Sequence, residues 1–498
     1  MLSKFIKCFL AGTAGLLLPF AGQAFSLNGP FAAWQRQEIG YQIGVDSGGP
    51  MNLGEEYRWN QRSITYAFDN SFLDYFGTEG VAAVEEAIEM LNSLPAVSDL
   101  SADLSEFPLD TRRVNFTASA LGLIDVKSFT LSALLEQLGL AAAERWVWTI
   151  RERVVINNVP FYSIIKRNFD PVTLAPSSYV NGTLYSYTIL QTYANPVIYE
   201  AVESAVDPLA SAVNSVAALV GVGGGTPDLV GFNQTSSSGL FYSGLTRDDV
   251  GGLRYLYNPR NYNMETLSTG AEIGTGGTGD SAGSPFGGGG GGGDPWAPVI
   301  GGGITTGAGA TAGIGTDPNA LGTGNQGQTF TNFVRPLINQ GLRGGVDKFV
   351  FTRVNYDSIL GTVLSYTNRY SDRYITNGQS VTQPVQIVST QPDIVFTAAD
   401  LGVIQEVPVT YSRGVNFVNQ DAINGVEALS GPGNISGGSV ISFSSVGPWW
   451  DQSLEGSREE DGLQGFLWGR FDGSTNTPTV FPSGISIREL ESKVLGRR

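Results

Sequence analysis

The sequence Gly-Leu-Thr-Arg-Asp-Asp-Val-Gly-Gly-Leu-Arg-Tyr-Leu-Tyr, from Gly244 to Tyr257, predicts an amphipathic helix with a defined start. Thr246 and Asp249 have the spacing of a capping box in which Asp replaces the usual Glu. The Asn-Pro pair at 258–259 ends the helix. Apolar residues at helical spacing form the face that we expect to be buried, namely Val250, Leu253, Leu256 and Tyr257.

Upstream of this helix, the hydrophobic pattern predicts a mixed α+β domain from residue 25 to residue 266. Strands are expected over 63–68, 146–155 and 179–193. One helix is expected over 80–94, with Thr78 as its cap and Pro95 at its end. A second, shorter helix is expected over 131–138, where Gly139 closes it.

Glycine dominates residues 267–329, which include an unbroken run from Gly287 to Gly293. Such a segment cannot bury enough apolar surface to offset its chain entropy, so it predicts a flexible linker. A glycine-rich adhesive segment is the alternative. Residues 330–498 contain short β-like runs separated by Gly, Pro, Asn and Asp, which favour a mainly-β, sandwich-like C-terminal domain. These runs include 348–356, 394–397, 407–411, 440–446 and 466–471, and a helix is expected over 487–495.

Residues 1–24 have the pattern of an export signal. Lys4 and Lys7 precede an apolar stretch over 9–20, and small residues lead to a cleavage site after Ala24. An uncleaved N-terminal anchor is the alternative. We therefore expect a secreted protein, extracellular or at the cell surface, with no transmembrane segment in the mature chain.

The chain contains no histidine, and its one cysteine, Cys8, lies in the predicted signal. Catalytic triads, Cys-His pairs and imidazole or thiolate zinc sites are therefore excluded. We expect no cofactor, although Ca²⁺ could bind through oxygen ligands. The net charge of -17 disfavours nucleic acid and anionic membranes as partners. The oligomeric state does not follow from the sequence.

Two blocks of the first domain resemble the start and end of a matrixin-type domain, of the metzincin class of secreted zinc peptidases. The first is Arg58-Trp59-Asn60 with the strand and helix that follow it, and the second is the stretch 244–257. The resemblance implies a metzincin-like fold. The family's catalytic helix carries His-Glu-x-x-His, in which two histidines hold zinc and the glutamate activates water.

The stretch most similar to that signature is 130–140. It places Glu136 at the glutamate position, so Glu136 is the candidate catalytic residue. Leu135 and Gly139 fall at the ligand positions, and neither side chain binds metal. The resemblance thus implies a peptidase scaffold without zinc ligands.

Acidic residues at two places are candidate calcium ligands. Asp248 and Asp249 are adjacent at a helix start, where capping is the favoured interpretation. Asp472 begins Asp-Gly-Ser-Thr-Asn, which has oxygens at alternate positions, but a hairpin turn is favoured there. The aromatic residues Trp449, Trp450 and Trp468 predict either a sugar-stacking face or, as the favoured alternative, core packing.

These observations favour a secreted, non-catalytic binding or structural protein on a degenerate metallopeptidase-like scaffold. Its partner would be an extracellular protein or a polysaccharide. One alternative is a secreted hydrolase, either a divergent metallopeptidase or a glycosidase that uses two distant carboxyl groups, one with a raised pKa. Another is a carbohydrate-binding surface protein.

Overall fold

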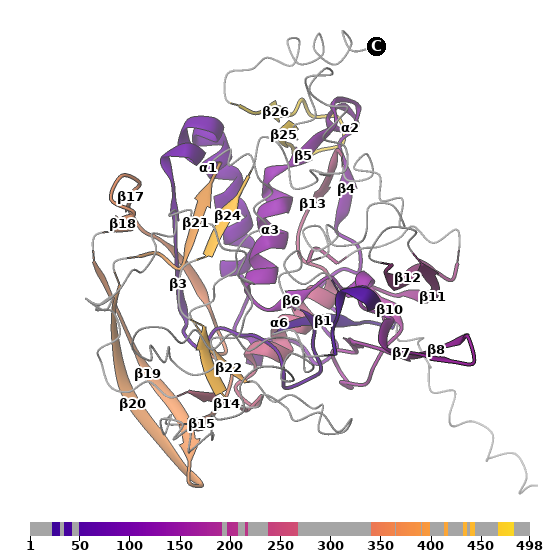
Figure 1. The fold of residues 1–498 in the computed structure, drawn as a ribbon. Helices are drawn as coiled ribbons and strands as arrows, with labels where there is room; N and C mark the ends of the chain where they lie inside the picture. The colour runs from indigo at the N-terminus through magenta and orange to yellow at the C-terminus, as the bar shows by residue number, and fades with distance from the viewer. Residues whose placement is uncertain are drawn as a thin grey trace, which may run out of the picture.

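The computed structural model describes residues 22–29, 34–41, 49–191, 197–207, 215–217, 238–266, 340–363, 365–389, 391–398, 413–416, 432–435, 439–443 and 467–482. Within these residues a few helices accompany many strands, so the chain has α+β structure (Figure 1). No helix in this part of the chain is long and apolar enough to cross a membrane. Several predicted segments lie outside the described residues: the signal up to residue 21, the linker over 267–329, the strand over 407–411 and the helix over 487–495.

The α-helices are α1 (Asn70–Asn92), α2 (Phe116–Leu121), α3 (Val126–Gln137) and α6 (Arg247–Tyr257). Short 3₁₀ helices are η1 (Gln37–Ile39), η2 (Val97–Asp99) and η3 (Ala143–Arg145). The strands before residue 267 are β1 (Phe25–Gly29), β2 (Gly49–Pro50), β3 (Ser63–Phe68), β4 (Arg112–Val114), β5 (Leu123–Asp125), β6 (Leu140–Ala141), β7 (Thr149–Ile156), β8 (Val159–Ile165), β9 (Asn168–Phe169), β10 (Tyr179–Val180), β11 (Thr183–Gln191), β12 (Tyr199–Ala205), β13 (Leu240–Tyr242) and β14 (Asn263–Thr266). The later strands are β15 (Gln340–Arg343), β16 (Val350–Arg353), β17 (Tyr356–Asp357), β18 (Thr362–Val363), β19 (Tyr366–Thr376), β20 (Gln379–Ser389), β21 (Ile394–Thr397), β22 (Arg413–Asn416), β23 (Pro432–Ile435), β24 (Ser439–Ser442), β25 (Leu467–Arg470) and β26 (Thr479–Val480).

Helix α6 confirms the helix predicted over 246–257. The Asp249 carboxylate accepts from the Thr246 amide at 2.9 Å, and the Thr246 hydroxyl accepts from the Asp249 amide at 3.4 Å, which completes the capping box. The predicted apolar face is buried, and α6 packs against β1. Tyr255 stacks on Phe25 of that strand with 5.5 Å between ring centroids.

Helix α1 begins earlier than the predicted start at residue 80. The Asp69 carboxylate caps it by accepting from the Ser71 amide at 3.1 Å. Gly77 then leaves helical geometry, with φ 58° and ψ −157°, so two helical segments meet at a kink. The kink rotates the first helical segment relative to the second, so the apolar residues of the two segments do not form one continuous stripe. The sequence pattern therefore predicted only the segment after the kink.

Helix α3 is buried along its whole length, since each residue from Val126 to Gln137 is in the core. A helix without a polar face has a weak periodic signal, which explains why only its second half was predicted. Its start is fixed by Asp125, whose Oδ2 accepts from the Ser128 amide at 2.9 Å. Its end is fixed by Gly139, at φ +106°.

The central sheet joins the two halves of the chain. Strand β3 lies between β16 and β21, and β24 lies beyond β21, with every neighbouring pair parallel. In Figure 1 the late strands β21 and β24 stand beside the early helix α1. Near α2, β25 pairs in parallel with β5.

These pairings correct the expected C-terminal sandwich. The region after residue 330 is rich in strands, as predicted, but β16, β21 and β25 complete sheets that contain strands from before residue 267. Short apolar runs buried on both faces are typical of parallel strands as well as of a sandwich core, and the sequence does not say which strand lies next to them.

An aromatic core fills the space between this sheet and helices α1 and α3. Trp468 has no exposed surface and lies 5.0 Å from Phe129 and 5.2 Å from Phe443, between ring centroids. Phe76 of α1 lies 6.3 Å from the same ring. Trp468 therefore packs as core, and its predicted alternative role in a sugar-stacking face is wrong. Trp449 and Trp450 lie outside the described residues.

Replacing Trp468 by alanine tests whether the two halves of the chain share one core. We expect Trp468→Ala to lower the free energy of unfolding by about 3–5 kcal/mol, because a large ring is lost from a closed site. Urea denaturation followed by circular dichroism measures this change. Phe116→Ala is the matched control, since that ring is 66% exposed, and its effect should be small. Equal effects of the two variants would contradict a shared core.

Gly139 offers a second test, of the turn that ends α3. A Cβ at this position would run into the carbonyl oxygen of Tyr57, and φ is +106°. Gly122 is the matched control, with φ +73° and nothing within 4 Å of its Cβ position. Gly122→Ala should cost about 1–2 kcal/mol from backbone strain alone, and Gly139→Ala should cost clearly more. Similar melting temperatures for the two variants would contradict the close approach of Tyr57.

Candidate functional site

The candidate catalytic residue Glu136 lies in the last turn of α3, and its exposed fraction is 7%. The end of this helix is held by two hydrogen bonds. Trp59 Nε1 donates to the Gln137 carbonyl at 2.8 Å, and the Tyr257 hydroxyl donates to the Leu138 carbonyl at 2.8 Å. Leu135 is fully buried. The helix that carries the candidate Glu136 is therefore a core element here, with every residue from Val126 to Gln137 buried.

Asp249 is saturated by contacts within the protein. Besides the capping bond, its two carboxylate oxygens accept from the amides of Val216 at 3.1 Å and Ala217 at 3.2 Å. The Ala217 carbonyl in turn accepts from the Ser132 hydroxyl of α3 at 3.2 Å. The carboxylate thus fixes the short segment 215–217 against α3.

Asp248 is also fully buried. Its Oδ2 accepts from the Asn181 amide at 2.5 Å, and the Asn181 side-chain oxygen accepts from the Asp248 amide at 3.3 Å. Its Oδ1 has no hydrogen-bond partner within the described part of the chain. Burial raises the pKa of Asp248 well above the usual carboxyl range.

Glu144 lies in the same buried cluster, and no sequence pattern indicated it. Its Oε2 accepts from the Ser215 hydroxyl at 3.1 Å. Burial, reinforced by the nearby charge of Asp249, raises the pKa of Glu144 to about 8. Burial raises the pKa of Asp249 as well. Within the described residues, no group of three or more His, Cys, Asp or Glu side chains could hold a metal ion. Calcium binding at Asp248 and Asp249 stays a prediction.

Asp472 lies in an exposed loop. Its Oδ1 accepts from the Asn476 side chain at 2.7 Å, and the loop connects the antiparallel strands β25 and β26. The loop connects two neighbouring antiparallel strands, which agrees with the favoured interpretation, and calcium binding at Asp472 stays a prediction.

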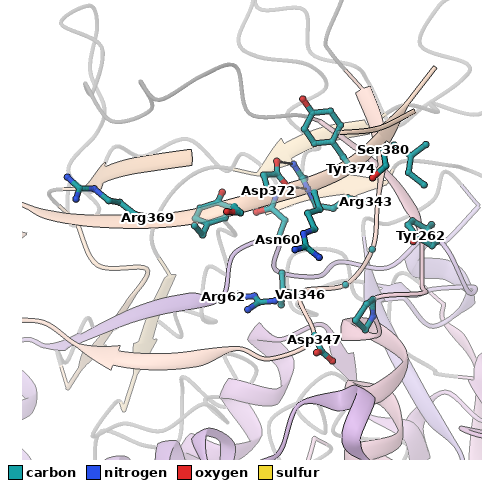
Figure 2. Close-up of a pocket in the computed structure, with 17 residues that line it drawn as sticks. Asn60, Arg62, Tyr262, Arg343, Val346, Asp347, Arg369, Asp372, Tyr374 and Ser380 are labelled. Carbon is teal, nitrogen blue, oxygen red and sulfur yellow. Dashed lines mark hydrogen bonds and ion pairs between the residues drawn. The ribbon is translucent and has the colours of Figure 1, made fainter. Parts of the chain in front are cut away.

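A groove of about 730 Å³ lies where segments from both halves of the chain meet. One wall comes from Asn60, Arg62 and the loop after α6, and the other from β15 and β19 (Figure 2). Its lining is polar and aromatic, with few aliphatic side chains: Asn60, Arg62, Pro259, Tyr262, Arg343, Gly344, Gly345, Val346, Asp347, Arg369, Tyr370, Ser371, Asp372, Arg373, Tyr374, Ile375 and Ser380.

A buried ion pair braces the groove wall. Arg343 Nε donates to Asp372 Oδ1 at 2.8 Å, and Nη2 donates to Oδ2 at 2.5 Å, with both side chains at least 95% buried. Arg58 donates to the Arg343 carbonyl at 2.5 Å and to the Asn261 carbonyl at 2.8 Å. Two-pronged pairing of this kind fixes the geometry of both side chains, so the wall is preformed.

The two carboxylates of the lining are both engaged by the protein. Asp372 pairs with Arg343, and Asp347 accepts from the Ser98 amide at 3.0 Å and from its hydroxyl at 3.1 Å. The groove therefore has no pair of free carboxylates of the kind that a glycosidase needs.

The remaining charges of the groove are cationic. Arg62, Arg369 and Arg373 have exposed side chains, and Arg369 donates to Gln386 at 3.0 Å. In Figure 2 Arg62 and Asn60 lie near Arg343, whereas Arg369 extends away at the far end of β19. Tyr262, on the opposite side of Figure 2 from Arg369, is 51% exposed. Such a surface attracts anions and offers aromatic faces for stacking.

No family model, curated protein or solved structure matches this chain.

The buried carboxyl groups predict an unusual dependence of stability on pH. In the unfolded chain a carboxyl group loses its proton near pH 4. When folding raises its pKa, the same group keeps its proton in the folded state up to that higher pKa. The contribution of such a group to the free energy of unfolding is therefore complete below pH 4. It is lost as pH rises toward and through the folded pKa, which for Glu144 is about 8. Stability should fall from pH 5 to pH 8, by up to about 1.4 kcal/mol per pH unit for each such group.

The variant Glu144→Gln removes one titrating group and keeps a neutral side chain of similar shape. The slope of unfolding free energy against pH, measured by urea titration at several pH values, should become less steep. Glu79→Gln is the control, because it makes the same change of side chain at a surface position, where Glu79 is 56% exposed and pairs with Arg470. Burial raises the pKa of Asp69, but hydrogen bonds that include those from Ser71 and Ser358 together outweigh it and lower the pKa. The stability that Asp69 contributes is therefore lost only as pH falls through that lowered pKa. An unchanged slope in Glu144→Gln would contradict a protonated Glu144.

Proposed function

We propose that the protein is a secreted, non-catalytic binding protein whose groove holds an acidic oligosaccharide. The observation that carries this proposal is the presence of three exposed arginines, Arg62, Arg369 and Arg373, in the lining of one groove, in a chain whose net charge is -17. Because the chain as a whole is acidic, an anionic ligand is repelled by most of it and attracted to the cationic groove.

The residue types of the groove suit a sugar that carries carboxylates. Guanidinium groups bind carboxylates in a two-pronged geometry. Tyr262 and Tyr374 offer ring faces of the kind that stack on sugars, and Asn60 and Ser380 offer hydrogen bonds for hydroxyl groups. A peptide ligand would favour apolar side-chain pockets, which this lining supplies sparingly.

The absence of catalysis is part of the proposal. We infer that the core is a matrixin-like scaffold without zinc chemistry, since Leu135 and Gly139 replace the ligands that the family pattern requires. The complete burial of α3 supports this, because a catalytic helix must present its residues to a substrate. A hydrolase that works in the groove is disfavoured by the engagement of Asp347 and Asp372.

Binding of polygalacturonate tests the proposed function. Titration calorimetry should detect binding that weakens as salt increases, and a neutral galactan should not bind. Arg62→Gln and Arg373→Gln should each weaken binding about ten-fold or more, the effect of losing one charge-assisted hydrogen bond. Arg353→Gln is the control, because Arg353 is a surface arginine, 47% exposed, outside the groove lining.

Three outcomes would contradict the proposal. Binding that is unaffected by Arg62→Gln and Arg373→Gln would place the sugar elsewhere. Release of new reducing ends from the polymer would make the protein a hydrolase. Metal-dependent cleavage of a protein substrate by the purified chain would contradict the non-catalytic scaffold.

A further inference from the structure

Strands β7 and β8 form a two-stranded hairpin that projects from the body of the molecule (Figure 1). Its turn consists of Asn157 and Asn158, both with left-handed φ, at 53° and 63°. Positive φ at both central residues is the geometry that matches the natural twist of a tight hairpin. The projecting end is therefore a regular β-hairpin with a defined turn.

The outer half of this hairpin is apolar and exposed. Val154 lies opposite Phe161, and Ile156 lies opposite Val159. Directly opposed side chains share a face of the hairpin, so these residues form one continuous apolar patch. Their exposed fractions are 41%, 54%, 54% and 52% for Val154, Phe161, Ile156 and Val159 respectively. Contiguous patches of this kind usually mark an interaction site.

The inner half of the hairpin is cationic and aromatic. Arg153 lies over the ring of Tyr199 at 3.9 Å, and Lys166 lies over the ring of Trp148 at 4.6 Å. Arg151 lies over the ring of Trp34 at 4.1 Å. The stacking holds each cation in place while leaving it partly exposed. The segment 149–167 has one acidic residue, Glu152, and four basic ones: Arg151, Arg153, Lys166 and Arg167.

The spacing of these two zones fits a lipid interface. A strand rises about 3.3 Å per residue, so Arg151 lies about 10 Å behind Val154 along β7. The headgroup layer of a bilayer leaflet is about 5–8 Å thick. With the apolar side chains at the acyl boundary, Arg153, the neighbour of Val154, would lie at the inner side of the headgroup layer and Arg151 at its outer side. Tyr199 and Trp148 are stacked against Arg153 and Lys166, and such aromatic rings favour the same interfacial layer.

We propose that the β7–β8 hairpin docks the protein on an anionic lipid surface, with the apolar patch in the interface and Arg153 and Lys166 on the headgroups. The acidic balance of the whole chain, which disfavours such membranes, does not oppose this contact, because charges beyond a Debye length are screened. A second copy of the chain is a poorer occupant, since symmetric pairing of the patches would bring two sets of cations together. The proposal is independent of sugar binding in the groove.

Flotation of the full-length protein with lipid vesicles tests the proposal. The protein should bind vesicles of phosphatidylcholine mixed with phosphatidylglycerol, and bind phosphatidylcholine alone at least ten-fold more weakly. The double variant Ile156→Ser, Phe161→Ser should lose at least ten-fold in binding, because both side chains leave water on docking. Lys166→Gln should weaken binding to the anionic vesicles and leave the small binding to neutral ones unchanged.

The matched control is the double variant Ile359→Ser, Leu360→Ser. These residues are 90% and 72% exposed in the turn between β17 and β18, where the same loss of apolar surface should leave vesicle binding intact. The substituted hairpin positions are exposed, so circular dichroism should show an unchanged fold. No vesicle binding by the natural chain, or equal losses in the two double variants, would overturn the proposal. Sedimentation velocity could instead show that the natural chain is a dimer and that only the hairpin variant is a monomer. That result would assign the patch to contact with a second copy of the chain.

Discussion

The placement of β3 between β16 and β21 is the constraint on which the rest of the structure depends. Strand β3 lies near the start of the chain, and its two parallel neighbours come from beyond residue 340. Parallel strands need long crossover connections, so their pairing has a high entropic cost before it gains any contacts. Burial of Phe396, Phe443 and Trp468 against α1 and α3 offsets that cost. The groove exists because the same closure brings β15 and β19 beside residues 60–62.

The sequence predicted what short-range chemistry determines. The capping box of Thr246 and Asp249 and the strands over 63–68 and 394–397 follow from local spacing, and the structure confirms each of them. What it did not predict is that the second of these strands lies beside the first. Ile394 to Thr397 is buried at every position, so no alternation indicates which face meets which neighbour. Partner choice is a tertiary property, and a single sequence carries no direct signal for it.

The candidate sites divide in the same way. The capping role of Asp249 was predicted, but its hold on Val216 and Ala217 was not, because nothing in their spacing relates residue 249 to residue 216. Glu144 was missed because its burial, which raises its pKa, depends on elements distant in sequence. The groove likewise combines Arg62 with Arg373, which lie on opposite sides of the glycine-rich stretch. Neither arginine has a sequence context that distinguishes it from a solvated surface residue.

Net charge is a weak guide to partners in a chain of this size, and the distribution of charge explains why. At physiological ionic strength the Debye length is about 8 Å, so a ligand responds to the nearest charges rather than to the total of -17. The cations of the groove and those of the β7–β8 hairpin lie on different elements, which Figure 1 places on opposite sides of the molecule in that view. The total charge of an acidic chain therefore does not exclude anions from a few defined places where cationic side chains lie closest to the ligand.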